Sequence, residues 1–237
     1  MLLKAGRFLL KSLVGTSPRP VFIVGCGHSG TTILLTQLSQ HPEIFGVPEE
    51  SRVFLPSKRN VPGISVNVWR VYKTMLEWER QALDHGAKVY IEKTPAHIRK
   101  ARLIRYLVPG ARFIGIFREP RDTVASLVAR GQPLDRAIGR YEQDNFRLDK
   151  LSRRPGTILV SFEQLLEDNE RNLDRIFAFL GVSNGSAVHM KVQKKKPDPP
   201  PREAHADRRR RQRAIGLYDS RGEWRENLTP NQAHAVV

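Results

Sequence analysis

The chain has 237 residues, enough for one large α/β domain with a sizeable core, and its 40% hydrophobic content excludes a chain that is disordered throughout. Its single cysteine, Cys26, excludes an intramolecular disulfide framework and favours a packed or loop-lining thiol over a reactive one. The formal net charge of +16 favours anionic partners, which include nucleic acid, a membrane surface and phosphorylated or sulfated small molecules.

Residues 1–20 are predicted to form a basic N-terminal arm that ends at Pro18 and Pro20. The apolar stretch 8–14 is interrupted by Lys11 and is much shorter than the ~20 residues that a membrane-spanning helix needs. We favour a frayed or docked helix here. A basic amphipathic arm and a poor signal peptide are the alternatives.

A strand, a glycine-rich turn and a helix follow the arm. Residues 21–24 are apolar and β-branched, which predicts a buried strand, and leucines at helical spacing predict a helix from about residue 33 to 40. Glycines let the turn between them approach a ligand closely, and the N–H groups that open the helix attract an anion. We therefore predict a phosphate-binding turn whose contact residues are Gly27, His28, Ser29, Gly30, Thr31 and Thr32.

The spacing of this turn equals that of the Walker A motif, with one difference. Thr31 stands where the Walker lysine would reach the terminal phosphates of ATP or GTP. The missing lysine argues against an NTPase or an ordinary P-loop kinase. A glycine turn that serves only tight packing is the alternative.

Predicted strands and helices alternate from residue 21 to 185, so we expect these residues to form the core domain. This alternation predicts a P-loop-like three-layer α/β/α fold with a central, mostly parallel sheet. Residues 186–237 are predicted to hold a basic, Pro-rich segment and a partial C-terminal lid. The further predicted strands are 44–47, 89–91, 113–117 and 157–160, and the further predicted helices are 68–83, 96–107, 121–130, 134–151 and 169–180.

Two cations are predicted to lie at the carboxyl ends of strands, where ligands bind in open α/β sheets. Arg118 follows strand 113–117, and its planar guanidinium suits a phosphate. Ser126 comes eight residues later, about two helical turns on. Lys93 follows strand 89–91. A strand-end salt bridge for Arg118 and a solvated Lys93 are the alternatives.

The turn and these segments together, over about residues 21–181, resemble the sulfotransferases that use 3′-phosphoadenosine-5′-phosphosulfate (PAPS). In that family a Ser-Gly-Thr-Thr turn binds the 5′-phosphosulfate of the donor, which matches residues 29–32 here. The resemblance implies that Arg118 and Ser126 hold the 3′-phosphate and that Lys93 stabilises the leaving phosphate. The residue before the serine is usually Lys or Arg in the family. This sequence has His28, a weaker and pH-sensitive cation.

The segment Pro48-Glu49-Glu50-Ser51-Arg52 is similar to the Glu-Glu-Thr-Arg of protein-tyrosine sulfotransferases. The resemblance implies that Glu50 is the general base for the acceptor hydroxyl and that Arg52 lies on the acceptor side. A surface ion network is the alternative, and Glu49 or His28 could serve as the base instead.

The stretch Glu92-Lys93-Thr94-Pro95 is similar to a segment of bacterial sulfotransferases. Glu92 is expected to orient Lys93. His97 is expected either to open a helix or to act as an acceptor-site base.

Residues 220–225 resemble the Gly-x-Trp-Arg of bacterial members. The resemblance implies that Arg221 or Arg225 reaches the 3′-phosphate, and that Trp224 pins a lid. Nearby, Arg121 is expected at the surface or at a helix end, with Asp122 as its neighbour.

The sequence thus predicts transfer of a sulfuryl group from PAPS, the co-substrate, to a hydroxyl or amine acceptor, with release of adenosine 3′,5′-bisphosphate. The acceptor is left open among small molecules, glycans, lipids and proteins. No metal is expected, since no side chains have ligand spacing. The alternatives are a degenerate P-loop kinase and a non-catalytic protein that binds nucleic acid or anionic surfaces.

We expect a cytoplasmic protein, because one cysteine gives secretion no support. The basic runs 194–196 and 208–211 favour peripheral contact with a membrane or an acidic glycan over nucleic acid. The oligomeric state is left open.

Overall fold

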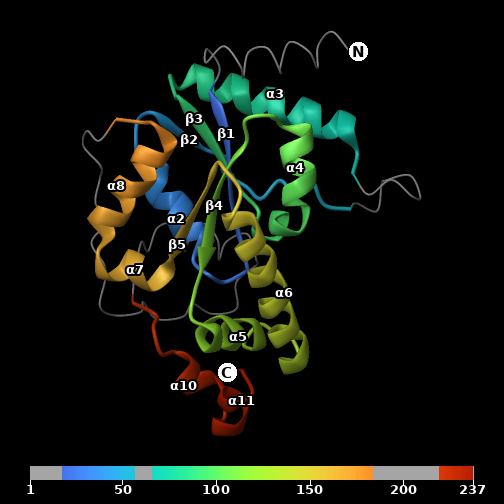
Figure 1. Cartoon of the computed structure of the whole chain (residues 1–237), viewed down its shortest axis with the longest axis vertical. Helices are drawn as coiled ribbons and strands as arrows, with labels where there is room; N and C mark the ends of the chain where they lie inside the picture. Colours follow the sequence, from blue (N-terminus) through green and yellow to red (C-terminus); the bar gives the residue numbers. More distant parts are fainter. Residues whose placement is uncertain (1–17, 57–65, 184–218, 237) are drawn as a thin grey trace, which may run out of the picture.

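Five parallel strands form the centre of the protein (Figure 1). The structure is a computed structural model that describes residues 18–56, 66–183 and 219–236. Their order in the sheet is β2-β3-β1-β4-β5, and all four ladders are parallel. This arrangement confirms the predicted α/β fold. The strands are β1 (Arg19–Gly25), β2 (Ile44–Gly46), β3 (Val89–Lys93), β4 (Arg112–Phe117) and β5 (Thr157–Ser161).

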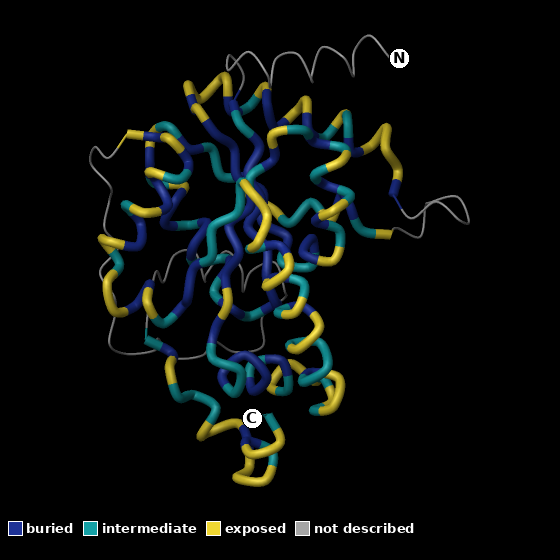
Figure 2. The backbone as a smooth tube through the Cα atoms, viewed as in Figure 1, coloured by how far each residue is buried: buried dark blue, intermediate teal, exposed yellow. Residues whose placement is uncertain are grey.

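Helices cover both faces of the sheet and give it the three predicted layers. Alternate residues of β1 face opposite sides: Val21 and Ile23 pack with one hydrophobic cluster, Phe22 and Val24 with the other. The first face carries α2 (Thr31–Leu38), α7 (Phe162–Glu167) and α8 (Asn169–Leu180). The second face carries α3 (Val68–Asp84), α4 (Ala101–Leu107) and α6 (Leu134–Ser152). Figure 2 shows the resulting buried centre.

Two helical segments differ from the prediction. The helix expected over 96–107 begins as a 3₁₀ helix, η1 (Pro95–Lys100), and becomes α-helical only as α4. Lys100 has φ −122° and ψ 11°, which breaks the α-helical conformation between the two. The separate helix α7 was not anticipated; it ends at Asp168, whose side chain accepts a hydrogen bond from the Arg171 N–H and so opens α8.

The C-terminal segment of residues 219–236 packs beside α5 (Pro120–Val128). It contains α10 (Trp224–Asn227) and α11 (Pro230–His234), and Leu228 and Ala233 pack with Ala125 of α5. Thr229 opens α11 with a capping box, in which its side chain and that of Gln232 accept hydrogen bonds from each other's backbone N–H groups.

Part of the predicted organisation lies outside the described residues. This holds for residues 1–17 of the basic arm and for the basic runs 194–196 and 208–211. In the part of the chain that the structure describes, no helix combines the length and the apolar character needed to cross a membrane.

Candidate active site

The glycine-rich turn joins β1 to α2 at the carboxyl edge of the sheet. His28 and Gly30 have positive φ angles of 75° and 90°, and Gly30 is the N-cap of α2. A Cβ at Gly30 would collide with the Phe162 ring, and one at Gly27 would lie 2.6 Å from the Arg140 guanidinium. At Gly30, space and backbone conformation therefore both favour glycine. The N–H groups of the first turn of α2 open toward this edge, as an anion site requires.

Ser29 is fully buried within this turn. Its hydroxyl oxygen has no hydrogen-bond partner among the described residues. A buried polar atom normally has a partner, so an unpaired one next to opening helix N–H groups indicates a place for a polar ligand.

Cys26 of the same turn is packed and not reactive. It is buried against Val124, Leu127 and Ala137. Burial, and next the charge of Asp144, raise the pKa of its thiol to about 12. This confirms the interpretation of a packed thiol.

Three predicted site residues from separate segments meet beside the turn. The Lys93 ammonium donates to Glu50 Oε1 at 2.7 Å and to Thr32 Oγ1 at 3.1 Å. Only 6% of the Lys93 side chain and 18% of the Glu50 side chain are exposed. A carboxylate and an ammonium are thus held together, mostly away from water, at the opening of the phosphate-binding turn.

Glu92 and Lys93 are successive residues of β3, so their side chains point to opposite faces of the sheet. The buried carboxylate of Glu92 accepts hydrogen bonds from Ser51 N–H (3.2 Å), Ser51 Oγ (2.9 Å) and Thr94 Oγ1 (2.5 Å). His97 Nδ1 lies 3.0 Å from its other oxygen. Since Ser51 follows Glu50, Glu92 ties the loop that carries Glu50 to the sheet.

His97 lies in the core. It is fully buried, and its ring packs edge-on against Phe54 and Phe22 at 5.2 and 6.5 Å between ring centres. Its Nε2 has no hydrogen-bond partner among the described residues. This position gives no support to an acceptor-contacting role for His97. Arg52, in contrast, is exposed, at a positive φ of 51°.

Arg118 lies just beyond β4 and is 7% exposed. Its guanidinium lies 4.8 Å from the centre of the Phe162 ring and donates to Ser220 O at 2.6 Å. Its Nε is buried and has no hydrogen-bond partner within the described ranges. Ser126 lies half-buried on α5.

Asp122 is the neighbour of Arg118 and not of Arg121, which corrects the expectation. Asp122 Oδ2 lies 3.6 Å from the Arg118 guanidinium, whereas Arg121 pairs with Glu119 at 2.6 Å. Asp122 also accepts hydrogen bonds from Gly222 N–H (3.0 Å) and Trp224 N–H (3.1 Å). This attachment has no signal in the sequence, because an acidic residue in the first turn of a helix is common and does not indicate a distant partner.

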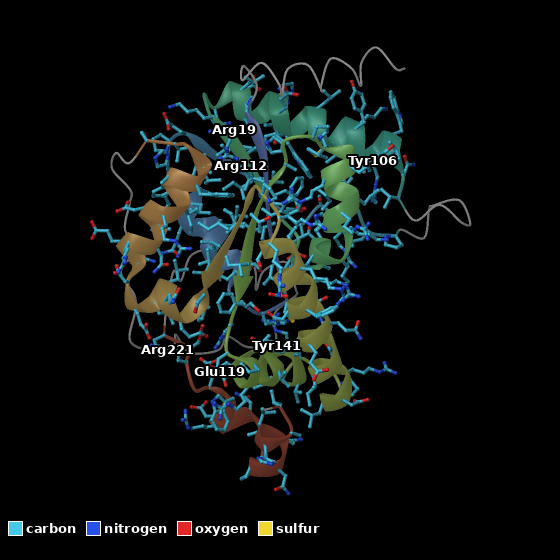
Figure 3. All side chains as sticks on the ribbon, in the orientation of Figure 1. Arg19, Tyr106, Arg112, Glu119, Tyr141 and Arg221 are labelled. Atoms are coloured by element: carbon cyan, nitrogen blue, oxygen red, sulfur yellow. The ribbon has the colours of Figure 1, made fainter. Side chains whose placement is uncertain are left out.

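Arg221 is held on the outside of the C-terminal segment. It pairs with Asp219 at 2.8 Å and with Glu167 at 2.9 Å, and the hydrogen bond to Asp219 is the main cause that raises its pKa. Figure 3 shows Arg221, Glu119 and Tyr141 at the same end of the sheet. Tyr141 donates from its hydroxyl to Arg118 O at 3.0 Å.

Among the described residues, no group of three or more His, Cys, Asp or Glu side chains could hold a metal ion.

A family model described as the sulfotransferase family matches residues 20–184. Similar solved structures include the sulfotransferase domain of the Synechococcus olefin synthase, with 19% identity over 70% of this chain and 74% of that one, at a TM-score of 0.57. A sulfotransferase from Alicyclobacillus acidocaldarius has 21% identity, covers 87% and 99% of the two chains and has a TM-score of 0.55. A mouse sulfotransferase solved in complex with PAP has 14% identity, covers 98% and 87%, and has a TM-score of 0.51. At these identities the solved structures establish a shared fold.

Proposed function

The chain belongs to the sulfotransferase family, and we propose that it takes the sulfuryl group from PAPS and passes it to a hydroxyl or amine acceptor. The second product is then adenosine 3′,5′-bisphosphate (PAP). One observation carries this proposal: Lys93, Glu50 and Thr32 come together within hydrogen-bond distance beside the glycine-rich turn.

The residues at the site fit an anionic donor. Ser29 Oγ and Arg118 Nε are buried polar atoms without partners in the described part of the chain, and each lies in a segment predicted to meet a phosphate. Ser29, Thr31, Thr32 and the opening N–H groups of α2 would hold the 5′-phosphosulfate. The mouse relative of the same fold was solved with PAP, which supports this choice of donor.

The 3′-phosphate would lie against Arg118 and Ser126. A guanidinium that stacks on Phe162 is held in a defined plane, and a planar pair of N–H groups suits a phosphate. Arg221 is paired with two carboxylates, so it would contact the phosphate only after leaving them.

The transfer itself needs a base on the acceptor side and a cation on the donor side. Glu50 accepts the proton of the acceptor hydroxyl or amine as the new bond to sulfur forms. Lys93 donates a hydrogen bond to the oxygen that leaves with the electrons of the broken sulfur–oxygen bond. His28 borders the same turn and adds a donor whose charge depends on pH. Arg52, exposed beside Glu50, orients the acceptor.

The first test is isothermal titration with PAP. We expect PAP to bind, and AMP, which lacks the 3′-phosphate, to bind about tenfold or more weakly, as loss of a charge-assisted contact predicts. Arg118→Ala should reduce the affinity for PAP to that for AMP. Arg153→Ala, which changes an exposed residue just after the end of α6, should not alter it. Equal affinities for AMP and PAP would rule out the 3′-phosphate site.

The second test identifies the acceptor. Sulfur-labelled PAPS should transfer its label to one class among glycans, lipids, protein tyrosines and small metabolites. ATP turnover with magnesium in place of label transfer would favour the kinase alternative.

A further inference from the structure

A second basic site lies at the opposite end of the sheet from the glycine-rich turn. A cavity of about 400 Å³ opens where β1 and β4 begin and where the chain turns into β5. It is lined by residues 18–20, 108–112, 155–156 and Arg105. Figure 3 shows Arg19 and Arg112 side by side at this end, far from Arg221 and Glu119. The cavity therefore does not belong to the active site.

Three arginines line this cavity, and none of its lining residues is acidic. The charge of the arginines is not balanced by carboxylates: within the described residues, their hydrogen bonds go to backbone carbonyls and to one hydroxyl. Arg19 donates to Leu180 O, Arg112 to Phe179 O, and Arg105 to Pro155 O and Thr157 Oγ1.

The surroundings of the cavity destabilise the charged form of two of its arginines. Burial is the main cause that lowers the pKa of Arg112, and the charge of Arg19 is the second. Burial is likewise the main cause that lowers the pKa of Arg105, followed by the charge of Arg154. An anion in the cavity would relieve both the repulsion and the lack of hydration.

Structural roles do not use all the donors of these guanidiniums. Arg19 and Arg112 cap carbonyls at the C-terminal end of α8, a common role for arginine. Each guanidinium has five N–H donors, however, and these caps use the terminal nitrogens only. Arg105 donates instead to Pro155 O and Thr157 Oγ1, and its Nε is buried without a hydrogen-bond partner in the described part of the chain.

The walls of the cavity indicate the chemical character of the rest of a ligand that carries the anionic group. Four prolines, Pro18, Pro20, Pro109 and Pro155, contribute rigid apolar surface. The volume lies in the range of about 300 to 1,000 Å³ that is typical of small-molecule sites. We propose that this cavity binds a small organic molecule whose phosphate or sulfate monoester group lies against Arg19, Arg105 and Arg112, with its apolar part against the prolines.

Titration of the full-length protein with phenyl phosphate, followed by NMR of backbone amides, tests this site separately from the active site. The amide signals of Gly110, Ala111 and Gly156 should shift and saturate at about millimolar concentration. Phenyl sulfate in a parallel titration shows which ester is preferred. Phenol, which has the ring without the charge, should not shift these signals.

Variants assign the binding to the arginines. Arg105→Gln and Arg112→Gln should each weaken phenyl phosphate binding about tenfold or more. Arg102→Gln is the matched control, because Arg102 is exposed on the same helix as Arg105 and does not line the cavity. Since Arg105 and Arg112 also bond to backbone carbonyls, thermal unfolding checks that both variants are folded, and either one suffices for the test.

Three results would overturn the proposal: unshifted signals at Gly110, Ala111 and Gly156 with both esters, equal shifts with phenol, or folded Arg105→Gln and Arg112→Gln proteins that bind as tightly as Arg102→Gln. Shifts confined to Gly27 and Gly30 would likewise place the anion only at the glycine-rich turn.

Discussion

Lys93 Nζ lies 2.7 Å from Glu50 Oε1, so that the cation and the proposed base of the reaction are in direct contact. A base that takes a proton from an acceptor must lie within hydrogen-bond reach of it, and a carboxylate has two oxygens that can accept a proton. The same contact keeps Lys93 beside Thr32 and the turn.

Replacing this base should slow the reaction without affecting donor binding. Glu50→Gln keeps the shape of the side chain and removes the proton acceptor, so we expect turnover to fall by about 10²- to 10⁴-fold while affinity for PAP stays within about twofold. The measurement is the initial rate of PAP release with the acceptor found by labelling, together with PAP titration. Glu49→Gln, which changes the exposed neighbour, is the control. If Glu49→Gln lost the activity and Glu50→Gln kept it, the assignment of the base would be wrong.

Glu92 makes the stability of the protein depend on pH. Burial alone would raise the pKa of this carboxyl, but the charge of His97 and hydrogen bonds from His97, Thr94 and Ser51 outweigh it and lower the pKa below its usual value. A lowered pKa stabilises the folded state above the unfolded-state value of about 4.3, and this contribution is lost as the pH falls through the folded-state pKa.

Urea unfolding at several pH values measures this contribution. At pH 7 we expect Glu92→Gln to lower the free energy of unfolding by about 1 to 3 kcal/mol, because a buried charged acceptor is lost. As the pH falls below the unfolded-state value of about 4.3, the variant should lose less stability than the wild type. Glu142→Gln, on the exposed side of α6, should follow the wild-type curve. Parallel curves for Glu92→Gln and the wild type would show that Glu92 does not contribute.

The turn between β1 and α2 depends on the conformation of one glycine more than on its side chains. Gly30 combines a φ of 90° with close contact to the Phe162 ring, so any Cβ there meets both backbone strain and a clash. The turn can therefore present the opening N–H groups of α2 only while residue 30 is glycine.

Two glycine substitutions separate this effect from a general effect of added bulk. Gly30→Ala should lower the free energy of unfolding by about 1 to 3 kcal/mol, the cost of a non-glycine residue in this conformation, and should abolish detectable PAP binding. Gly139→Ala lies inside α6, where an added Cβ meets nothing within 4 Å, and should be neutral or stabilise by about 1 kcal/mol. Thermal unfolding and titration with PAP measure both. Wild-type PAP affinity in Gly30→Ala would show that the turn does not need this geometry.

Across the whole molecule, several long-range contacts join the C-terminal segment to the site, and the carboxylate of Asp122 makes two of them. Asp122, near the start of α5, binds the N–H groups of Gly222 and Trp224, which follow it by 100 and 102 residues. Arg121 and Arg225 each stack on the Trp224 ring at 4.6 Å. Arg118 reaches the same segment through Ser220 O.

Removing this carboxylate should loosen the segment while the sheet remains intact. In Asp122→Ala we expect hydrogen exchange at the amides of Gly222 and Trp224 to become about tenfold or more faster, as loss of bonds to a charged acceptor predicts, and PAP binding to weaken. Amides of β1 and β4 should keep their protection. Asp149→Ala, at an exposed position of α6, is the control. Unchanged exchange at both amides would show that the segment stays in place without Asp122.

The order of strands and helices, the parallel sheet and the glycine-rich turn were predictable from the sequence. Apolar runs, helical spacing and glycine positions are local properties, because each depends only on residues that are close in the sequence. The resemblance of residues 29–32 and 48–52 to sulfotransferase motifs likewise depends on neighbours in sequence. The strand predicted over 89–91 lies within β3, and the helix predicted over 169–180 has the bounds of α8.

The partners of the polar side chains came only from the tertiary structure. Lys93 meets Glu50 across 43 residues and Arg118 meets Ser220 across 102, and such contacts depend on which strands are neighbours in the sheet. The burial of His97, the inward direction of Glu92 and the attachment of Asp122 follow from the same packing. A local pattern selects helix, strand or turn. The layers of the fold decide which side chains share a low-dielectric interior, where a charge or donor without a partner costs free energy.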